Sequence, residues 1–336
     1  MSTRTPQSLP LVTAIVGCYN HARFVEEALA SVKAQTYPNL QLIVFDDCSR
    51  DDSVALIERW LAANAADATF LKHERNIGVC RSLNDALKYA RGVYVALLGA
   101  DDVWLPGKTT DQVQIMESLP PSVGVVYTDA YRIDERGEFI PGMFIASYRN
   151  FSAIPSGDIR DVLWGGNFIP AMTTLIRAEC FRVCGGYDET LCFEDWDMWL
   201  RLAEHFTFSF SDVVSAKYRI VGTSMCRTAR REMEQSEIQV LIKHLQRGTL
   251  PERLRSEAFV KHARMRYESG AIDGHALLRA AWRLYPSKGT LAMYVASGLG
   301  ISYRRFQAFE GLWKPARAFV RRLVSGAQRR CGSARE

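Results

Sequence analysis

Apolar and polar positions follow two alternating periods along the first part of the chain. Short apolar runs rich in Val, Ile and Leu have the composition of strands buried on both faces. These runs lie at residues 11–17, 40–45, 69–71, 94–98 and 123–127. Between them, apolar residues return every three or four positions, which is the spacing of one helix face. The alternation predicts an α/β fold with a mostly parallel sheet and helices on both of its faces.

The predicted helices fill the gaps between these strands. The first begins near Val25 and ends at the Tyr-Pro-Asn turn of residues 37–39, because proline cannot continue a helix. The others are expected at about 51–61, 82–90 and 108–119. Each carries an apolar stripe that can pack on the sheet.

The pattern becomes looser after the fifth strand. Residues 133–169 combine Gly and Pro with few apolar runs, which predicts loops around short strands. Residues 172–176 predict a returning strand, and residues 196–203 predict a helix with an apolar face. From residue 227 onward the pattern is helical.

Three acidic pairs stand where predicted elements meet: Asp46-Asp47 and Asp101-Asp102 after two strands, and Glu194-Asp195 before a helix. Buried like charges repel unless a cation or hydrogen-bond donors lie beside them. Ligands of open parallel sheets collect at the carboxyl ends of the strands. The strand-end pairs therefore predict a divalent cation with oxygen ligands. The structural alternatives are a helix cap at Asp101 or Asp102, and a turn or cap formed by Asp47 with Ser49.

Four ordered stretches resemble the family 2 glycosyltransferases of the GT-A fold. They are residues 16–37, 43–51, 76–102 and 185–201. Each stretch alone is weak, but together their order and spacing cover residues 11–220. The resemblance implies a GT-A type, Rossmann-like and mostly parallel sheet. The helical pattern from residue 227 onward, which the resemblance does not cover, adds a C-terminal helical region.

The resemblance implies a site for a nucleotide-diphospho-sugar donor at the strand ends. Tyr19 would stack on the base, and Asp47 would accept hydrogen bonds from the base or ribose. Asp102, with Asp101 beside it, would hold Mg²⁺ or Mn²⁺, which neutralises the departing diphosphate. The residues implied in donor nucleotide binding are Gly17, Tyr19, Asn20, Asp47, Asn76, Arg81, Asp101 and Arg219.

The resemblance also implies a catalytic residue, Asp195. As the general base it would deprotonate a hydroxyl of a saccharide or lipid-linked saccharide acceptor, and attack would invert the anomeric centre. Trp196 and Trp199 behind it are expected in the core. Two positions depart from the family pattern. Gly99 stands where a carboxylate is frequent and Val221 where a His is frequent, so the ligand contacts of those two side chains are absent.

Cysteines and apolar segments indicate the compartment. The chain has eight cysteines but no Cys-x-x-Cys pair, which is typical of reduced thiols in a cytosolic protein. Residues 1–10 lack the apolar core of a secretory signal, and residues 291–303 are too few to span a bilayer. We therefore expect a cytoplasmic protein, either free or attached peripherally to the inner face of the cell membrane.

Charge divides the chain in two. Residues 1–224 carry 20 Lys and Arg against 28 Asp and Glu, a net charge of −8, whereas residues 225–336 carry 22 against 9, a net charge of +13. Basic amphipathic helices of this kind lie on anionic membranes. The alternative is a helical subdomain packed on the catalytic domain. No nucleic-acid reader motif is present, so no nucleic-acid partner is expected.

These observations predict a domain plan and a function. Residues 1–224 form a GT-A catalytic domain, with a nucleotide-sugar half at about 11–128 and an acceptor half at about 129–224, and residues 225–336 form a basic helical region. The protein is expected to be an inverting, metal-dependent glycosyltransferase in the synthesis of bacterial surface polysaccharide or glycolipid.

Two alternatives to this function stay open. A sugar-nucleotide pyrophosphorylase would carry a Gly-rich basic loop after the first strand, where residues 17–21 read Gly-Cys-Tyr-Asn-His. A catalytically inactive nucleotide-sugar-binding protein would be favoured if Asp195 faced away from the cleft.

Overall fold

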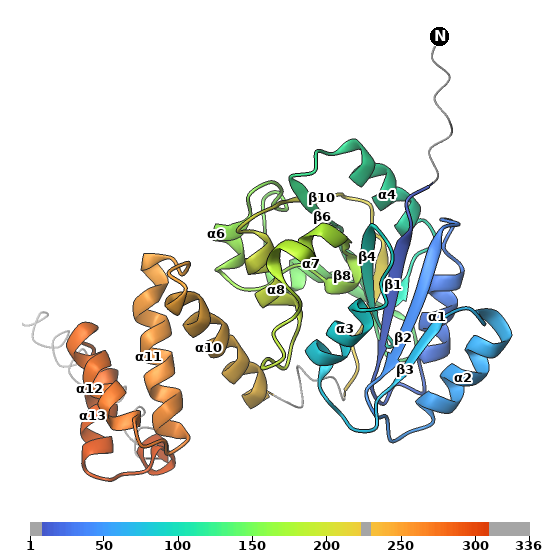
Figure 1. Cartoon of the computed structure of the whole chain (residues 1–336). Coiled ribbons are helices and arrows are strands. Elements are labelled where there is room, and N and C mark those ends of the chain that lie inside the picture. The colour runs from blue at the N-terminus through green and yellow to red at the C-terminus, as the bar shows by residue number, and fades with distance from the viewer. Residues whose placement is uncertain (1–8, 223–229, 309–336) are drawn as a thin grey trace, which may run out of the picture. The chain divides into compact units, whose positions relative to one another are not determined.

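The structure of the protein is a computed structural model that describes residues 9–222 and 230–308 (Figure 1). Its centre is a seven-stranded sheet of order β10-β6-β9-β4-β1-β2-β3. All neighbours in this sheet are parallel except at β9, which runs antiparallel to β4 and β6. The strands are β1 Val12–Cys18, β2 Leu40–Asp46, β3 Thr69–Lys72, β4 Tyr94–Gly99, β6 Val123–Tyr127, β9 Leu175–Arg177 and β10 Thr207–Phe210.

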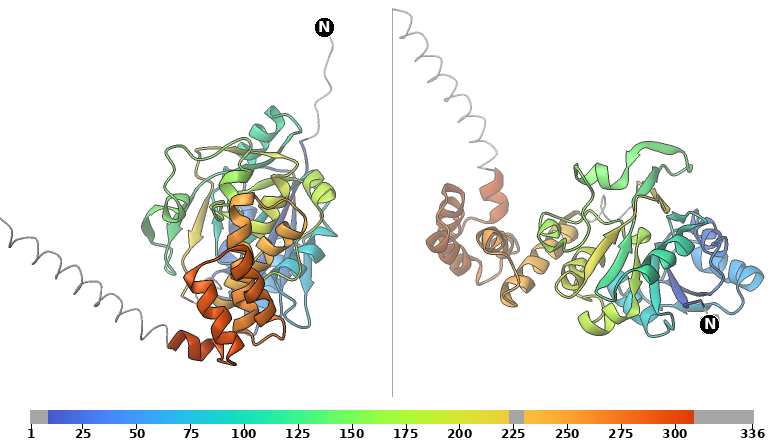
Figure 2. Two further views of the ribbon diagram at one scale, coloured as in Figure 1. Left: turned by 90° about the vertical axis from the view of Figure 1, so that its left-hand side faces the viewer. Right: turned by 90° about the horizontal axis from the view of Figure 1, so that it is seen from above.

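Helices lie around this sheet, as Figure 2 shows from two further sides. They are α1 Val25–Lys33, α2 Ser53–Asn64, α3 Val79–Leu87, α4 Lys108–Ser118, α6 Arg160–Leu163, α7 Ala178–Cys184 and α8 Asp195–Leu202. A further helix, α5 Phe144–Tyr148, contacts residues 130–133 and 139–143 instead. The core is formed by the apolar runs predicted as strands. β1 and β4 are buried along almost their whole length, because helices cover the faces of a parallel sheet.

A second sheet of four strands has the order β5-β11-β7-β8. Its strands are β5 Val103–Trp104, β7 Ala130–Ile133, β8 Phe139–Met143 and β11 Ala216–Arg219. β11 pairs antiparallel with β5 and parallel with β7. Because β5 follows Asp101-Asp102 directly, this pairing brings the end of β11 to the acidic end of β4.

The structure confirms the predicted α/β class, the mostly parallel sheet and the C-terminal helices. One boundary differs from the expectation. The strand predicted at 172–176 begins instead with a 3-10 helix, Ala171–Thr173, and the strand β9 starts only at Leu175. The short strands β5, β10 and β11 were not predicted, because two to four residues are too few to show a period.

The chain divides into two compact units, residues 1–233 and 234–336. Most of the described part of the second unit is helical: α10 Arg230–Gln246, which starts just before the division, α11 Glu252–Glu268, α12 Gly274–Leu284 and α13 Lys288–Gly298. Its core is formed by Ala263, Tyr267, Leu278, Ala281, Met293 and Ala296. Across the described ranges, no helix has the length and hydropathy needed for a bilayer span.

Candidate functional site

The carboxyl ends of β1, β2 and β4 lie at one edge of the central sheet. Cys18 pairs with Asp46, and Gly17 pairs with Gly99, so the loops after these strands start side by side. The strand order places β1 between the two acidic strand ends. The residues that follow these strands are Tyr19 and Asn20 after β1, Asp47 after β2, and Asp101 and Asp102 after β4.

Asn20 joins the loops after β1 and β2. Its N–H donates to Ser49 Oγ at 2.8 Å, and the N–H of Arg50 donates to Asn20 Oδ1 at 2.7 Å. The φ of Asn20 is 57°, a left-handed conformation that Asn adopts more readily than most residues. Tyr19 beside it is 38 % exposed, so its ring can be reached from solvent.

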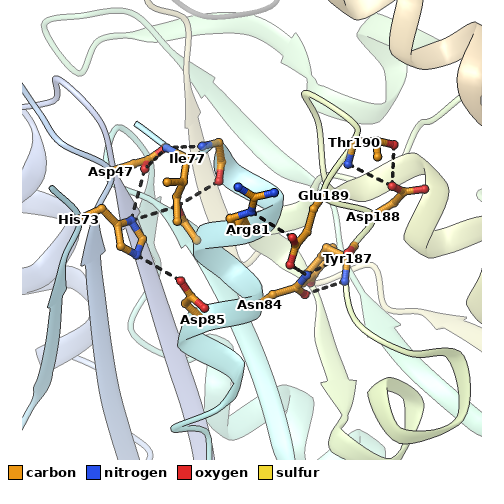
Figure 3. Close-up of polar contacts among 12 residues, drawn as sticks. Asp47, His73, Ile77, Arg81, Asn84, Asp85, Tyr187, Asp188, Glu189 and Thr190 are labelled. Atoms are coloured by element: carbon orange, nitrogen blue, oxygen red, sulfur yellow. Dashed lines mark hydrogen bonds and ion pairs between the residues drawn. The ribbon is translucent and has the colours of Figure 1, made fainter. Parts of the chain in front are cut away.

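The two carboxylates at the end of β2 have different partners. Asp46 accepts hydrogen bonds from the N–H and the hydroxyl of Ser49, at 2.7 and 2.6 Å. Asp47 accepts from the N–H groups of Ile77 and Gly78, at 2.8 and 2.9 Å (Figure 3). The turn to Ser49, which the sequence offered as an alternative for Asp47, is therefore formed by Asp46. Asp47 instead fixes the backbone at the start of α3.

His73 also contacts Asp47, and the sequence did not single it out. Its Nδ1 lies 3.3 Å from Asp47 Oδ1 and 3.3 Å from Ser82 Oγ, and its Nε2 lies 3.6 Å from Asp85 Oδ2 (Figure 3). His73 follows β3, which pairs with β2. Only this pairing brings residue 73 to residue 47, so no local pattern could have indicated it.

Asn76 and Arg81, predicted on the donor side, are both exposed. Asn76 directly precedes Ile77, whose N–H donates to Asp47. Arg81 lies on α3, and its Nε donates to Glu189 Oε2 at 3.0 Å. Both residues border the corner around Asp47.

Asp102 is buried at the end of β4, with 7 % exposure, while Asp101 is partly exposed. Burial, and then the charge of Asp101, raise the pKa of Asp102 well above its ordinary value. The N–H of Arg219 donates to Asp102 Oδ1 at 2.8 Å and lowers this pKa, but burial outweighs it. A further cation beside Asp102 would stabilise its ionised form.

The guanidinium of Arg219 is buried and already has three partners. Nε donates to the carbonyl of Asp101 at 2.8 Å, Nη1 to the carbonyl of Asp134 at 3.1 Å, and Nη2 to Glu27 Oε2 at 2.6 Å. These bonds use three of its five N–H groups. Arg219 thus ties β11 to the loop after β4, and a phosphate would have to share it with these partners.

The pair Asp101 and Asp102 is the part of this edge that fits a divalent cation. Among the residues that the structure describes, no three or more His, Cys, Asp and Glu side chains form a group that could hold a metal ion. Mg²⁺ is commonly bound by one or two carboxylates, with phosphates and waters as its other ligands. Two carboxylates therefore fit a cation whose remaining ligands come from a bound diphosphate. A Cβ at Gly99 would lie 2.8 Å from Asp101 Oδ1, so a larger residue there would crowd the pair.

Comparison with known proteins gives the family. Residues 13–177 match the family model described as glycosyl transferase family 2. The chain carries a family 2 glycosyltransferase domain. An uncharacterized glycosyltransferase of Rickettsia prowazekii is 28 % identical over 229 residues, which are 68 % of this chain and 70 % of that protein. The putative glycosyltransferase EpsE of Bacillus subtilis is 29 % identical over 198 residues, which are 58 % of this chain and 67 % of EpsE.

Solved structures share the fold of this glycosyltransferase. The mannosyltransferase PcManGT of Pyrobaculum calidifontis, in complex with GDP-Man and Mn²⁺, has a TM-score of 0.54 at 19 % identity, covering 90 % of this chain and 84 % of that one. TarS residues 1–349 of S. aureus, in complex with UDP-GlcNAc, has a TM-score of 0.56 at 15 % identity, covering 89 % and 83 %. At these identities the likeness shows the GT-A type fold alone. The family match favours a transferase over the pyrophosphorylase that the sequence left open.

Asp195 lies beyond the matched segment, at the first residue of α8 in the first compact unit. Burial raises its pKa to about 6, although the N–H of Trp196 and Nδ2 of Asn167 each donate to its carboxylate at 2.6 Å and lower that pKa. Burial, and then the charge of Asp195, raise the pKa of Glu194 to about 8. Asp195 therefore has the lower pKa of the pair and is the more readily ionised member.

Asn167 was missed because it belongs to a loop that shows no periodic pattern. It is preceded by Gly165 and Gly166, and the φ of Gly166 is 114°, so this turn requires glycine. Trp196 and Trp199 are buried, as expected, and Trp196 Nε1 donates to the carbonyl of Leu163.

Packing alone accounts for one predicted site residue. A Cβ at Gly17 would lie 2.4 Å from Cζ of Phe45 on the neighbouring strand. The ring of Phe45 therefore fills the space that a side chain at residue 17 would need, so packing favours glycine here whether or not a ligand binds. At the position where the family often has His, Val221 is buried in this glycosyltransferase.

A groove of about 990 Å³ lies away from these residues, at the opposite end of β1 and β4. It is lined by residues that include Pro10, Tyr37, Gly92 and Arg177, and by none of the predicted site residues. The candidate site is therefore the carboxyl edge of the sheet, not this groove.

Proposed function

We propose that the protein is an inverting, metal-dependent glycosyltransferase that moves a sugar from a nucleotide-diphospho-sugar to an acceptor hydroxyl. The observation that carries this proposal is the carboxyl edge itself. It combines an exposed aromatic ring at Tyr19 with a buried carboxylate at Asp102. Asp195, the half-buried carboxylate with a pKa of about 6, supplies the general base that transfer to a hydroxyl requires.

The donor would bind across the ends of β1, β2 and β4. Tyr19 would stack on the base, with Gly17 and Asn20 beside it, and Asp47 keeps acceptor capacity for the base or ribose since a carboxylate offers about four lone-pair sites. Asn76, Arg81, Asp101 and Arg219 border the same edge and would meet the ribose and diphosphate. Asp102 would hold Mg²⁺ or Mn²⁺, which supplies charge neutralisation for the diphosphate leaving group.

Asp195 would act as the general base. A base works best when its pKa lies near the operating pH, and burial moves the carboxyl of Asp195 toward that range. Its two hydrogen bonds, from Trp196 N–H and Asn167 Nδ2, fix the orientation of the carboxylate. Attack by the deprotonated hydroxyl on the face opposite the diphosphate would invert the anomeric centre.

The acceptor would be a saccharide or lipid-linked saccharide, in the synthesis of bacterial surface polysaccharide or glycolipid on the cytosolic side. The second unit supports a role at the inner face of the membrane. Leu291, Val295 and Leu299 follow one another at spacings of four and are 39 %, 49 % and 72 % exposed, so they form one apolar stripe. Lys288, Arg304 and Arg305 near this stripe in the chain are also exposed. Apolar and basic residues together fit an anionic bilayer.

Calorimetry with UDP, GDP and dTDP, each with and without Mn²⁺, tests the donor site. We expect one of them to bind, with an affinity at least about tenfold higher when Mn²⁺ is present, because the cation bridges carboxylate and diphosphate. If none binds under either condition, the proposed function is wrong.

Two variants, Asp102→Asn and Asp67→Asn, test whether Asp102 holds the cation. Asp102→Asn keeps an oxygen that can accept from Arg219 N–H but removes the charge, so the Mn²⁺-dependent gain in affinity should disappear. Asp67→Asn makes the same change at an exposed loop position and should bind like the wild type. Equal Mn²⁺ dependence in both variants would exclude Asp102 as the metal ligand.

A further inference from the structure

Helix α3 lies between Asp47, where the donor would bind, and residues 187–193, which lead into Asp195 (Figure 3). At its start, the N–H groups of Ile77 and Gly78 are held by the two oxygens of Asp47. Further along, its side chains reach residues 187–193, which directly precede Glu194-Asp195. One short helix thus contacts both chemical parts of the proposed site.

Asn84 makes the most specific of these contacts. Its Nδ2 donates to the carbonyl of Tyr187 at 2.9 Å, and the N–H of Tyr187 donates to Asn84 Oδ1 at 2.8 Å. One amide side chain therefore pairs with both backbone polar groups of one residue, as a neighbouring strand would. Nδ2 also donates to Glu189 Oε1 at 3.0 Å. Tyr187 is only 4 % exposed, so its backbone position is fixed inside the protein.

The neighbouring glycine makes room for this contact. A Cβ at Gly186 would lie 2.4 Å from Asn84 Oδ1, which is shorter than any tolerable contact. The φ of Gly186 is not in the left-handed region, so backbone conformation does not demand glycine there. The close approach of Asn84 does.

Other bonds hold the two ends of the same segment. Cys80, on α3, lies with its Sγ 3.3 Å from the carbonyl of Phe193, the residue before Glu194. Arg201, on α8, donates from Nη1 to the carbonyl of Cys184 at 2.7 Å and from Nη2 to the carbonyl of Gly186 at 2.8 Å. Residues 184–193 are therefore held between α3 and α8, and Asn84 holds them at Tyr187, between the bonds to Gly186 and Phe193.

We propose that Asn84 is a positioning residue that sets the place of Asp195 relative to the donor, an inference that rests on the function proposed above. Asn84 touches neither the proposed donor contacts nor the acceptor base. It acts through the backbone of Tyr187, eight residues before Asp195. A base displaced by about 1 Å can lose about a hundredfold in rate, so a loose segment would lower turnover without changing nucleotide binding.

Asn84→Ala tests this role, with Asn64→Ala as the matched control. Asn64 is exposed on α2 and bonds only the carbonyl of Trp60 within its own helix. In Asn84→Ala we expect the N–H of Tyr187 to exchange with deuterium about fivefold to tenfold faster, as for the loss of one hydrogen bond. The kcat for nucleoside diphosphate release, from whichever of UDP-GlcNAc and GDP-Man is turned over, should fall about 10- to 100-fold. The Kd for the matching nucleotide should stay within about twofold, because no donor contact is removed. Asn64→Ala should change none of the three.

Unchanged kcat in Asn84→Ala, with faster exchange at Tyr187, would overturn the positioning role and leave the proposed function intact. An equal loss of nucleotide affinity and kcat would overturn it too, since that result would indicate damage to the donor site around Asp47. Failure of the proposed function shows differently, as no binding of UDP, GDP or dTDP to the wild type with or without Mn²⁺. If Asn84→Ala does not fold, Gly186→Ala places a Cβ against Asn84, pushes the same segment away from α3 and must give the same split between kcat and Kd.

Discussion

Replacing the proposed base with its neutral isostere should inactivate the enzyme and change how its stability depends on pH. In Asp195→Asn, the single amide oxygen keeps the bond from Trp196 N–H or the bond from Asn167 Nδ2 and loses the other, but the side chain keeps its size and shape. The variant cannot accept a proton from a hydroxyl. We expect nucleoside diphosphate release to fall by at least about a hundredfold, with nucleotide affinity unchanged.

The change in pH dependence follows from the raised pKa of Asp195. Folding holds this carboxyl at a pKa of about 6 against an ordinary value of 3.8, mainly through burial. Below the ordinary value the carboxyl is protonated in both states and carries no penalty. As pH rises from about 4 to 6 the unfolded chain ionises first, so the wild type loses stability that the variant keeps.

The size of this change can be set from the same values. A fully desolvated group with this pKa would lose about 3 kcal/mol at neutral pH. Solvent reaches part of the half-buried Asp195, so we expect the stability of the variant relative to the wild type to rise by about 1–2 kcal/mol from pH 4 to pH 7. Urea unfolding of both proteins at the two pH values measures this rise. The hydrogen bond that the amide loses lowers the stability of the variant at both pH values alike. An equal difference between the two proteins at pH 4 and pH 7 would refute a desolvated Asp195.

Three further changes probe the neighbouring parts. Gly17→Ala forces a Cβ against the ring of Phe45, so thermal unfolding should show a loss of about 1–3 kcal/mol; an unchanged midpoint would show that the ring can move aside. Asn167→Ala removes a hydrogen bond that favours the ionised Asp195, so the acid limb of the kcat/KM profile should move up by about one pH unit; an unmoved limb would assign it to another group. Val295→Asp should weaken co-sedimentation with phosphatidylglycerol vesicles by about tenfold, whereas Val213→Asp, at the same 49 % exposure in the first unit, should not; equal sedimentation of both would exclude the α13 stripe.

Local patterns predicted the long buried strands but not the short ones. β1, β4 and β6 are buried on both faces, as expected for strands of a parallel sheet covered by helices. β5 has only two residues, and β11 has a mixed burial pattern, so pairing with distant partners creates them. β11 could not have been found from its own residues.

The chemistry of the site was predicted in part for the same reason. The acidic pairs are contiguous in sequence, so they could be recognised before the structure was known. That Asp46 holds the turn to Ser49 while Asp47 holds the start of α3 could not be predicted, because it depends on which backbone N–H groups the fold brings to each carboxylate. The contact of Asn84 with Tyr187 joins residues 103 positions apart, and the sequence around neither residue predicts it.

The anomeric configuration of the first product tests the central claim most directly. The enzyme would be incubated with Mn²⁺ and an α-linked donor, UDP-GlcNAc or GDP-Man, with water as the acceptor, and proton NMR would follow the released sugar before mutarotation. A base at Asp195 acting opposite a metal-bound diphosphate predicts that the β anomer of the sugar appears first in the wild type, and that Asp195→Asn releases little or none. Initial release of the α anomer, or release at wild-type rate by the variant, would contradict the account.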